Sequence, residues 1–203
     1  MTCSKLHVYV GPMFSGKTSL LVQKLEICNL LTDHDSIYIC HSLDKLREKK
    51  SHSEKTLFGL SQLKRTQTFQ TEMLSSLDLP LTRTTTVCID EGQFFDQDDL
   101  HDFVKKLLKS SFLDEIYVVG LDGDYKGEYF LGSGLYRLMP LADTFQKLNT
   151  ALCLKCVQEK KQKCVATMTD VVSSSSDRKD LIEIGGSEKY VSVCRRHHHA
   201  FTE

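Results

Sequence analysis

The stretch Gly11-Pro12-Met13-Phe14-Ser15-Gly16-Lys17-Thr18 decides the fold, because it matches the pattern G-x-x-x-x-G-K-[ST] in full. Backbone N–H groups of such a loop wrap phosphate groups, and its glycines permit that close approach. The pattern predicts that Lys17 reaches the β- and γ-phosphates of ATP, and that Thr18 offers its hydroxyl to Mg²⁺. The expected nucleotide ligands in and beside this loop are Gly11, Pro12, Met13, Phe14, Ser15, Gly16, Lys17, Thr18 and Ser19.

Strand and helix patterns alternate on both sides of this loop. Apolar runs at residues 6–10, 36–40, 86–89 and 115–119 are typical of buried strands. Helical spacing of apolar residues follows the loop at residues 18–31 and recurs at residues 100–108. Such an alternation predicts an α/β fold of the P-loop (RecA-like) type, with a doubly wound, mainly parallel sheet.

The texture of the sequence changes near Thr150, where short β-like pieces and two cysteine-containing corners replace the α/β alternation. We therefore expect an ATP-binding α/β domain at residues 1–149 and a small, β-rich, zinc-binding domain at residues 150–203. The polar, cation-rich segment at residues 42–65 and the serine run at residues 173–176 are expected to be flexible loops.

Two adjacent carboxylates end the third predicted strand. Asp90 suits the Mg²⁺-orienting acid of a P-loop enzyme, and Glu91 would lie near the γ-phosphate, where a base can accept a proton. That base could activate water, as in an ATPase, or a substrate hydroxyl, as in a kinase, and spacing alone does not separate the two. Phe94 and Phe95 follow, and either could floor a pocket for a planar ring or pack in the core; for Phe95 we favour the core.

Two corners of the type C-x-x-[CH] indicate a metal site. Cys153 and Cys156 are followed, after 37 intervening residues, by Cys194 and His197. This spacing predicts a closed, tetrahedral Cys₃His site for a structural Zn²⁺, which would stabilise a small domain with few large apolar residues. His197 is the preferred fourth ligand, and the alternatives within reach are His198, His199 and Cys164.

The composition excludes several classes of partner. A formal net charge of −1 offers no basic excess for a phosphate backbone, so no nucleic acid is expected. No stretch approaches the roughly 20 apolar residues that span a bilayer, and the N-terminus lacks a secretory pattern. Cys28, Cys40 and Cys88 lie in apolar runs, as reduced, buried cysteines do. We therefore expect a cytoplasmic protein without a membrane partner.

The motifs GPMFSGKT, IDEGQFF, LDGDYKGEYF, CLKC and IGGSEKYVSVCRRH occur in one order. In that order the chain resembles the zinc-containing cellular and poxvirus-type thymidine kinases, from about Leu6 to His197. The resemblance implies transfer of the ATP γ-phosphate to the 5′-hydroxyl of thymidine, and of deoxyuridine, in nucleotide salvage. It also implies a homotetramer with feedback inhibition by dTTP.

Roles for individual residues come from this resemblance. Glu91 matches the family's general base and Asp90 its metal-side acid, while Gln93 joins the expected nucleotide ligands. Gly185 and Tyr190 belong to a lasso-like loop whose backbone hydrogen-bonds the base in the family, and zinc is expected to tie the ends of this loop together. The implied substrate-binding residues are Met13, Phe94, Leu121, Tyr125, Phe130, Leu181, Glu183, Ile184, Gly185 and Tyr190.

The chain departs from the family pattern in three segments. The family's D-x-R after the second strand reads Asp44-Lys45-Leu46-Arg47 here, so Asp44 is an expected ligand and Arg47 is the expected catalytic arginine, with Lys45 or neither as alternatives. The last C-x-x-C is C-x-x-H. Residues 157–167 carry a lysine-rich run in place of the family's pattern, which leaves one edge of the thymine pocket unassigned.

Two other function classes compete with a kinase. A P-loop ATPase with a structural zinc would use Glu91 to activate water, and a motor of that class needs a basic track or a second RecA-like domain. A zinc-ribbon module would use its corners to bind a macromolecule. This short, near-neutral chain shows no such motor features, and a zinc-ribbon module leaves LDGDYKGEYF unexplained.

Overall fold

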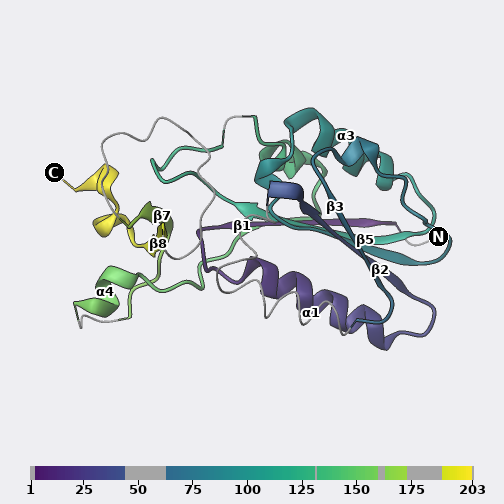
Figure 1. Ribbon diagram of the computed structural model, residues 1–203, viewed down its shortest axis with the longest axis horizontal. Helices are drawn as coiled ribbons and strands as arrows, with labels where there is room; N and C mark the ends of the chain where they lie inside the picture. Colours follow the sequence, from purple (N-terminus) through teal and green to yellow (C-terminus); the bar gives the residue numbers. More distant parts are fainter. Residues whose placement is uncertain (1–2, 44–62, 131, 160–162, 173–188, 203) are drawn as a thin grey trace.

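The computed structural model describes residues 3–43, 63–130, 132–159, 163–172 and 189–202 of the chain (Figure 1). A six-stranded sheet has the strand order β3-β2-β4-β5-β1-β6, and its strands all pair in parallel. Its elements are β1 (Lys5–Gly11), α1 (Lys17–Leu30), β2 (Asp35–His41), β3 (Thr66–Thr71), β4 (Thr85–Ile89), α3 (Gln97–Leu107), β5 (Leu113–Leu121) and β6 (Thr144–Lys147).

Helices cover both faces of this sheet, as the doubly wound fold predicts. Helix α1 lies on one face and α3 on the other (Figure 1). Alternate residues of β4 serve the two layers: Val87 and Ile89 join the core that includes α3, and Cys88 joins the core beneath α1. Both faces of the strand are buried, which explains its uninterrupted apolar run.

Phe95 lies in the core, as expected. Its side chain is only 1% exposed and belongs to the larger cluster, together with Leu100 and Phe103 of α3. The residue immediately precedes Asp96, the N-cap of α3, whose carboxylate accepts hydrogen bonds from the backbone N–H groups of Asp98 and Asp99. This cap fixes where the helix begins after the acidic strand end.

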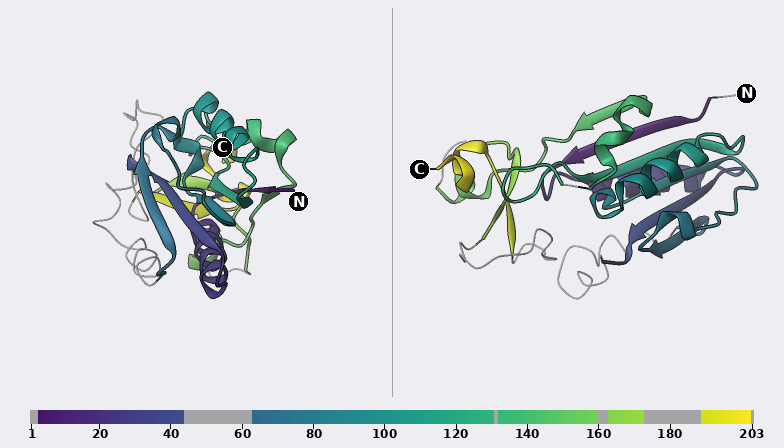
Figure 2. Two further views of the ribbon diagram at one scale, coloured as in Figure 1. Left: turned by 90° about the vertical axis from the view of Figure 1, so that its right-hand side faces the viewer. Right: turned by 90° about the horizontal axis from the view of Figure 1, so that it is seen from above.

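A smaller C-terminal region, defined here as the described residues 150–159, 163–172 and 189–202, lies beyond the sheet on the side opposite the N-terminus (Figure 2). It holds a two-stranded antiparallel sheet of β7 (Met168–Val171) and β8 (Tyr190–Val193). The carboxyl ends of the parallel strands point toward this region (Figure 1). Its helical turns are α4 (Leu154–Gln158), η5 (Arg195–His197) and η6 (His199–Phe201).

The sequence prediction omits two strands and one α-helix of the described residues. Strands β3 and β6, with the sequences TQTFQT and TFQK, lie at the two edges of the large sheet, and helix α4 forms within a cysteine corner. The edge strands are mostly polar, so the apolar run that marks the central strands is missing. The predicted boundary at residue 150 lies between β6 and α4 and stays a prediction.

Candidate active site

The phosphate loop connects the end of β1 to the start of α1, as the motif predicts. Two of its residues show why glycine is needed. A Cβ on Gly11 would lie 2.7 Å from both Leu148 O and Ser15 Oγ, and Gly16 has a φ of 79°. Phe14 also has a positive φ, of 63°, which is uncommon for a residue with a side chain. The loop is therefore tightly wound.

Lys17 curls back over this loop and is only 8% exposed. Its Nζ donates hydrogen bonds to Gly11 O at 3.1 Å and Pro12 O at 2.8 Å. The ammonium group thus lies at the carbonyls of the loop itself. A phosphate group held by the loop's N–H groups would come within reach of this cation.

Asp90 and Thr18 meet where β4 ends beside the loop. Asp90 is 3% exposed and accepts hydrogen bonds from the Tyr38 hydroxyl at 2.9 Å and from the Glu91 backbone N–H at 2.8 Å. Burial and the nearby Glu91 carboxylate raise the pKa of Asp90 to about 6, against the opposing effect of the Tyr38 and Thr18 hydroxyls. A hydroxyl beside a buried carboxylate is an oxygen pair that fits Mg²⁺.

Glu91 stands at the turn that follows, with a φ of 52°. Gln93 bridges it to the next strand: its Nε2 donates to Glu91 Oε2 at 2.5 Å, and its Oε1 accepts from Leu121 N at 2.9 Å. Gly120 makes room for this bridge, because a Cβ there would lie 2.6 Å from Gln93 Oε1. The amide of Gln93 thus orients the carboxylate of Glu91, a role that no motif of the sequence indicates, and its place among the nucleotide ligands stays a prediction.

The expected thymine-binding residues occupy several elements. Phe94 follows β4 and contacts the ring of His41, with 5.9 Å between the ring centroids. Leu121 and Phe130 are buried, and so is Tyr190 in β8. Tyr125 reaches the C-terminal region, where its ring lies 6.3 Å from that of His199.

Six expected site residues lie outside the described part of the chain. Two belong to the segment after β2 and four to the segment between β7 and β8: Asp44, Arg47, Leu181, Glu183, Ile184 and Gly185. The flexible loops expected at residues 42–65 and 173–176 also lie outside it, apart from residues 42–43 and 63–65.

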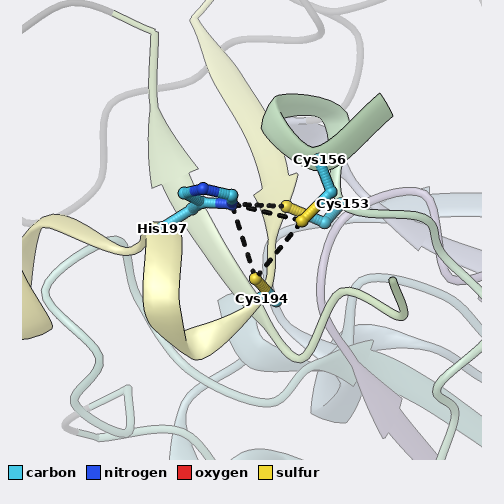
Figure 3. A group of neighbouring side chains, drawn as sticks. All are labelled: Cys153, Cys156, Cys194 and His197. Carbon is cyan, nitrogen blue, oxygen red and sulfur yellow. Dashed lines mark hydrogen bonds between the residues drawn. The ribbon is translucent and has the colours of Figure 1, made fainter. Parts of the chain in front are cut away.

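The four expected zinc ligands converge in the C-terminal region (Figure 3). His197 Nδ1 lies 3.4 Å from the sulfurs of Cys153 and Cys156 and 3.5 Å from that of Cys194. The sulfurs of Cys156 and Cys194 are 3.9 Å apart. Tetrahedral zinc, with Zn–S near 2.3 Å and Zn–N near 2.0 Å, requires edges of about 3.8 Å between sulfurs and about 3.5 Å between sulfur and nitrogen. The donor set therefore fits zinc in both chemistry and spacing.

The thiols of this cluster differ in pKa. Burial opposes ionisation of Cys153, but hydrogen bonds from the backbone of Cys194 and Cys156 outweigh it and lower the pKa of Cys153. Burial and the neighbouring thiols raise the pKa of Cys156, to about 12. A divalent cation would allow all three sulfurs to be thiolates. Glu159 Oε1 lies 3.2 Å from the outer nitrogen of His197, in the manner of a carboxylate that orients a ligating histidine.

Of the alternative fourth ligands, the two histidines have other partners and Cys164 lies beside the cluster. His198 is fully buried, with Nε2 3.1 Å from Thr169 O and Nδ1 accepting from Ala200 N. His199 Nδ1 lies 2.6 Å from the buried carboxylate of Asp170. The Cys164 thiol contacts the thiols of Cys156 and Cys194 and lies 3.7 Å from Val165 O, but it is not one of the four residues whose ligand atoms converge. The geometry favours His197, as the two-residue spacing predicts.

A P-loop at the carboxyl edge of a parallel sheet, with a hydroxyl–carboxylate pair beside it, defines a nucleotide-binding α/β protein with an added Cys₃His site. A sequence model described as thymidine kinase matches residues 4–198, so this chain belongs to the thymidine kinase family. Membership makes it an ATP-dependent phosphotransferase and implies Mg²⁺ as well. Among the residues that the structure describes, no helix is both long and apolar enough to cross a membrane.

Individual relatives agree with the family assignment. The chain is 32% identical to thymidine kinase of fowlpox virus (strain NVSL) over 97% of both chains. It is 33% identical to thymidine kinase of Oryza sativa subsp. japonica, over 96% of this chain and 66% of the rice protein. Cytosolic thymidine kinase of Bos taurus is 28% identical, over 96% of this chain and 71% of the bovine one.

Proposed function

We propose that this protein transfers the γ-phosphate of ATP to the 5′-hydroxyl of thymidine, and of deoxyuridine, and so forms a nucleoside monophosphate for salvage. The observation that carries the proposal is the Glu91 carboxylate, which Gln93 orients next to Asp90 at the edge of the phosphate loop. The comparisons support thymidine as the substrate, since the relatives named above are thymidine kinases.

The phosphate loop would bind the triphosphate of ATP. Phosphoryl transfer depends mainly on positioning and on stabilising charge, which backbone N–H groups and the Lys17 ammonium supply. Thr18 and Asp90 would hold Mg²⁺, which neutralises charge on the β- and γ-phosphates when bound. Arg47 would help at the phosphates, together with Asp44, as the family pattern suggests.

Glu91 would act as the general base and take the proton of the 5′-hydroxyl. The hydrogen bond from Gln93 holds its carboxylate in one orientation, which a base needs at the moment of transfer. The same carboxylate could activate water, and this is the alternative of a P-loop ATPase. We favour the kinase because the comparisons support it and nothing in them supports a motor.

Thymidine would bind between the end of the sheet and the C-terminal region. Phe94, Leu121 and Phe130 would contact the thymine ring together with Met13, Tyr125 and Tyr190. Backbone groups of the segment that holds Leu181, Glu183, Ile184 and Gly185 would hydrogen-bond the base. Zinc on the Cys₃His cluster would be structural, because all four positions are protein ligands.

We further propose a homotetramer, feedback inhibition by dTTP and a cytoplasmic location. A relative named cytosolic thymidine kinase supports the location. The family resemblance supports the other two, and sedimentation together with inhibition by dTTP would test them.

The test is formation of thymidine 5′-phosphate from thymidine, ATP and Mg²⁺, with the wild type beside Glu91→Ala and Glu91→Gln. We expect turnover to fall roughly 10²- to 10⁴-fold in both variants, because neither side chain can accept the proton. Glu91→Gln keeps the size of the side chain and so controls for packing. Hydrolysis of ATP by the wild type without any nucleoside product would overturn the proposal in favour of an ATPase.

A further inference from the structure

Two threonines of the C-terminal region hydrogen-bond the backbone of the phosphate loop. The Thr150 hydroxyl donates to Ser15 O at 2.6 Å, across 135 positions in the sequence. The Met13 N–H donates to Thr169 Oγ1 at 3.0 Å, across 156 positions. Neither threonine belongs to a motif of the sequence, and the proposed mechanism gives neither of them a role.

Each of these bonds fixes one peptide unit of the loop. Ser15 O and the Gly16 N–H belong to the same planar peptide, so a donor on the oxygen also sets the direction of the N–H. Gly16 has a φ of 79°, and glycine adopts positive and negative φ with similar ease. The hydrogen bond therefore restrains a peptide that the backbone of Gly16 does not fix. The Pro12–Met13 peptide is held at both ends, by Lys17 Nζ on Pro12 O and by Thr169 on Met13 N.

The threonines are themselves held in place by the C-terminal region. Thr150 lies three residues before Cys153, and Thr169 pairs with Ser192 of β8, two residues before Cys194. Thr169 is 4% exposed, and the buried His198 ring lies 3.1 Å from its carbonyl oxygen. Thr150 thus lies next to the first cysteine corner, and Thr169 pairs with the strand that leads to the second.

We propose that Thr150 is a positioning residue for phosphoryl transfer, which orients the Ser15–Gly16 peptide toward the triphosphate, and that Thr169 is its counterpart at Met13. The C-terminal region then contributes to the nucleotide site as well as to the nucleoside site. This inference rests on the proposed function, in which the loop holds ATP.

The experiment compares Thr150→Val with Thr150→Ser. Valine keeps the shape and deletes the donor, whereas serine keeps the donor. We expect Thr150→Val to weaken Mg²⁺–ADP binding by calorimetry, and to raise KM for ATP, by about 3- to 10-fold, the usual range for one hydrogen bond. KM for thymidine should change by less than about twofold, and Thr150→Ser should restore nucleotide binding. Thr150 is exposed, so both variants should fold.

Ser192→Ala is the matched control, because it removes a hydroxyl bond to Leu152 O within the same region without touching the loop. The inference is overturned if Thr150→Val binds ADP like the wild type, or if Ser192→Ala weakens ADP equally. Thr169→Val should repeat the effect on ADP and gives a second measurement. Because ADP binding needs no phosphoryl transfer, a wild type that binds ADP but makes no thymidine 5′-phosphate would refute the proposed function alone.

Discussion

The two parts of the molecule are stabilised by different means. Among the described residues, the larger core of the α/β part contains 18 buried hydrophobic residues drawn from the sheet, α3 and the turns beside them. The core of the C-terminal region contains six, and three of these are the cysteines Cys153, Cys156 and Cys194. The larger core is big enough to stabilise the fold of the α/β part by itself, whereas a core as small as that of the C-terminal region needs a further stabilising element such as a bound metal.

Because their cores differ in size, the two parts position their functional residues in different ways. Asp90, at the edge of the sheet, is fixed by a buried strand before any ligand arrives, whereas the phosphate loop is also held by Thr150 and Thr169 of the C-terminal region. We expect the C-terminal region to take its position from zinc at the cysteine cluster, and its two hydrogen bonds to the loop to depend on that zinc. The comparison predicts that perturbations of the two parts will have separable effects.

The largest effect is expected from Cys194→Ser, which removes one zinc ligand. Zinc content, measured by atomic emission, should fall from about one ion per chain to near zero. Protection of amides in β7 and β8 against hydrogen exchange should disappear, while β1, β4 and β5 stay protected, because only the small core needs the metal. Cys164→Ser is the matched control and should keep its zinc. Loss of protection across both sheets would show that the two parts unfold as one.

Lys17→Met should have the next largest effect and should leave both parts folded. Removing the ammonium from the phosphate loop is expected to reduce turnover roughly 10³-fold or more, because positioning and charge carry this reaction. Turnover and zinc content should be measured on the same preparation, with Lys24→Met of α1 as control. Zinc loss in Lys17→Met would contradict the separation of the two parts.

The sequence predicts some elements and site residues of the two parts better than others. The central strands can be predicted from the sequence because burial on both faces gives continuous apolar runs. The phosphate loop can be predicted because it needs fixed residue types. Strands β3 and β6 were missed since edge strands can be polar. The choice of His197 follows from spacing, but only the contacts of His198 and His199 show why these two lie outside the four-residue cluster. Thr150 and Thr169 carry no local signal, because their partners lie over a hundred residues away.

The buried carboxylate of Asp90 should destabilise the folded α/β part at neutral pH, so that replacing it by a neutral side chain should raise stability. Asp90 has a pKa of about 6 in the folded chain against a usual value of 3.8, so the folded state binds the proton more tightly than the unfolded state. Stability therefore falls as pH rises from about 4 to 6, and the full cost, at most about 3 kcal/mol, is present at neutral pH.

Asp90→Asn should consequently raise the melting temperature at pH 7.5 in the absence of Mg²⁺ and nucleotide, while abolishing efficient turnover. The gain should shrink toward pH 5, where Asp90 of the wild type is protonated. Asp102→Asn on the exposed side of α3 serves as control and should leave the melting temperature unchanged. A gain that is independent of pH would mean that repacking, rather than relief of a buried charge, stabilises the variant.

The smallest effect is expected from replacing Glu159, which tests how the C-terminal region orients one of its zinc ligands. Its carboxylate lies 3.2 Å from the outer nitrogen of His197 and so favours the tautomer that presents Nδ1 to the metal. Partners of this kind change metal affinity by about 10- to 100-fold. Glu159→Ala should weaken zinc binding within this range in competition with a chromophoric chelator. Glu159→Gln retains an acceptor and loses only the charge, so its effect should be smaller.

Glu26→Gln, on the exposed face of α1, controls for the change in net charge. Equal weakening in Glu159→Gln and Glu159→Ala would assign the effect to the charge of Glu159 rather than to its hydrogen bond. Unchanged affinity in both would show that the ring of His197 is oriented by its turn, η5, alone. In that case the backbone of the C-terminal region would position its metal ligands. The two parts would then differ less in how they position functional residues than the sizes of their cores suggest.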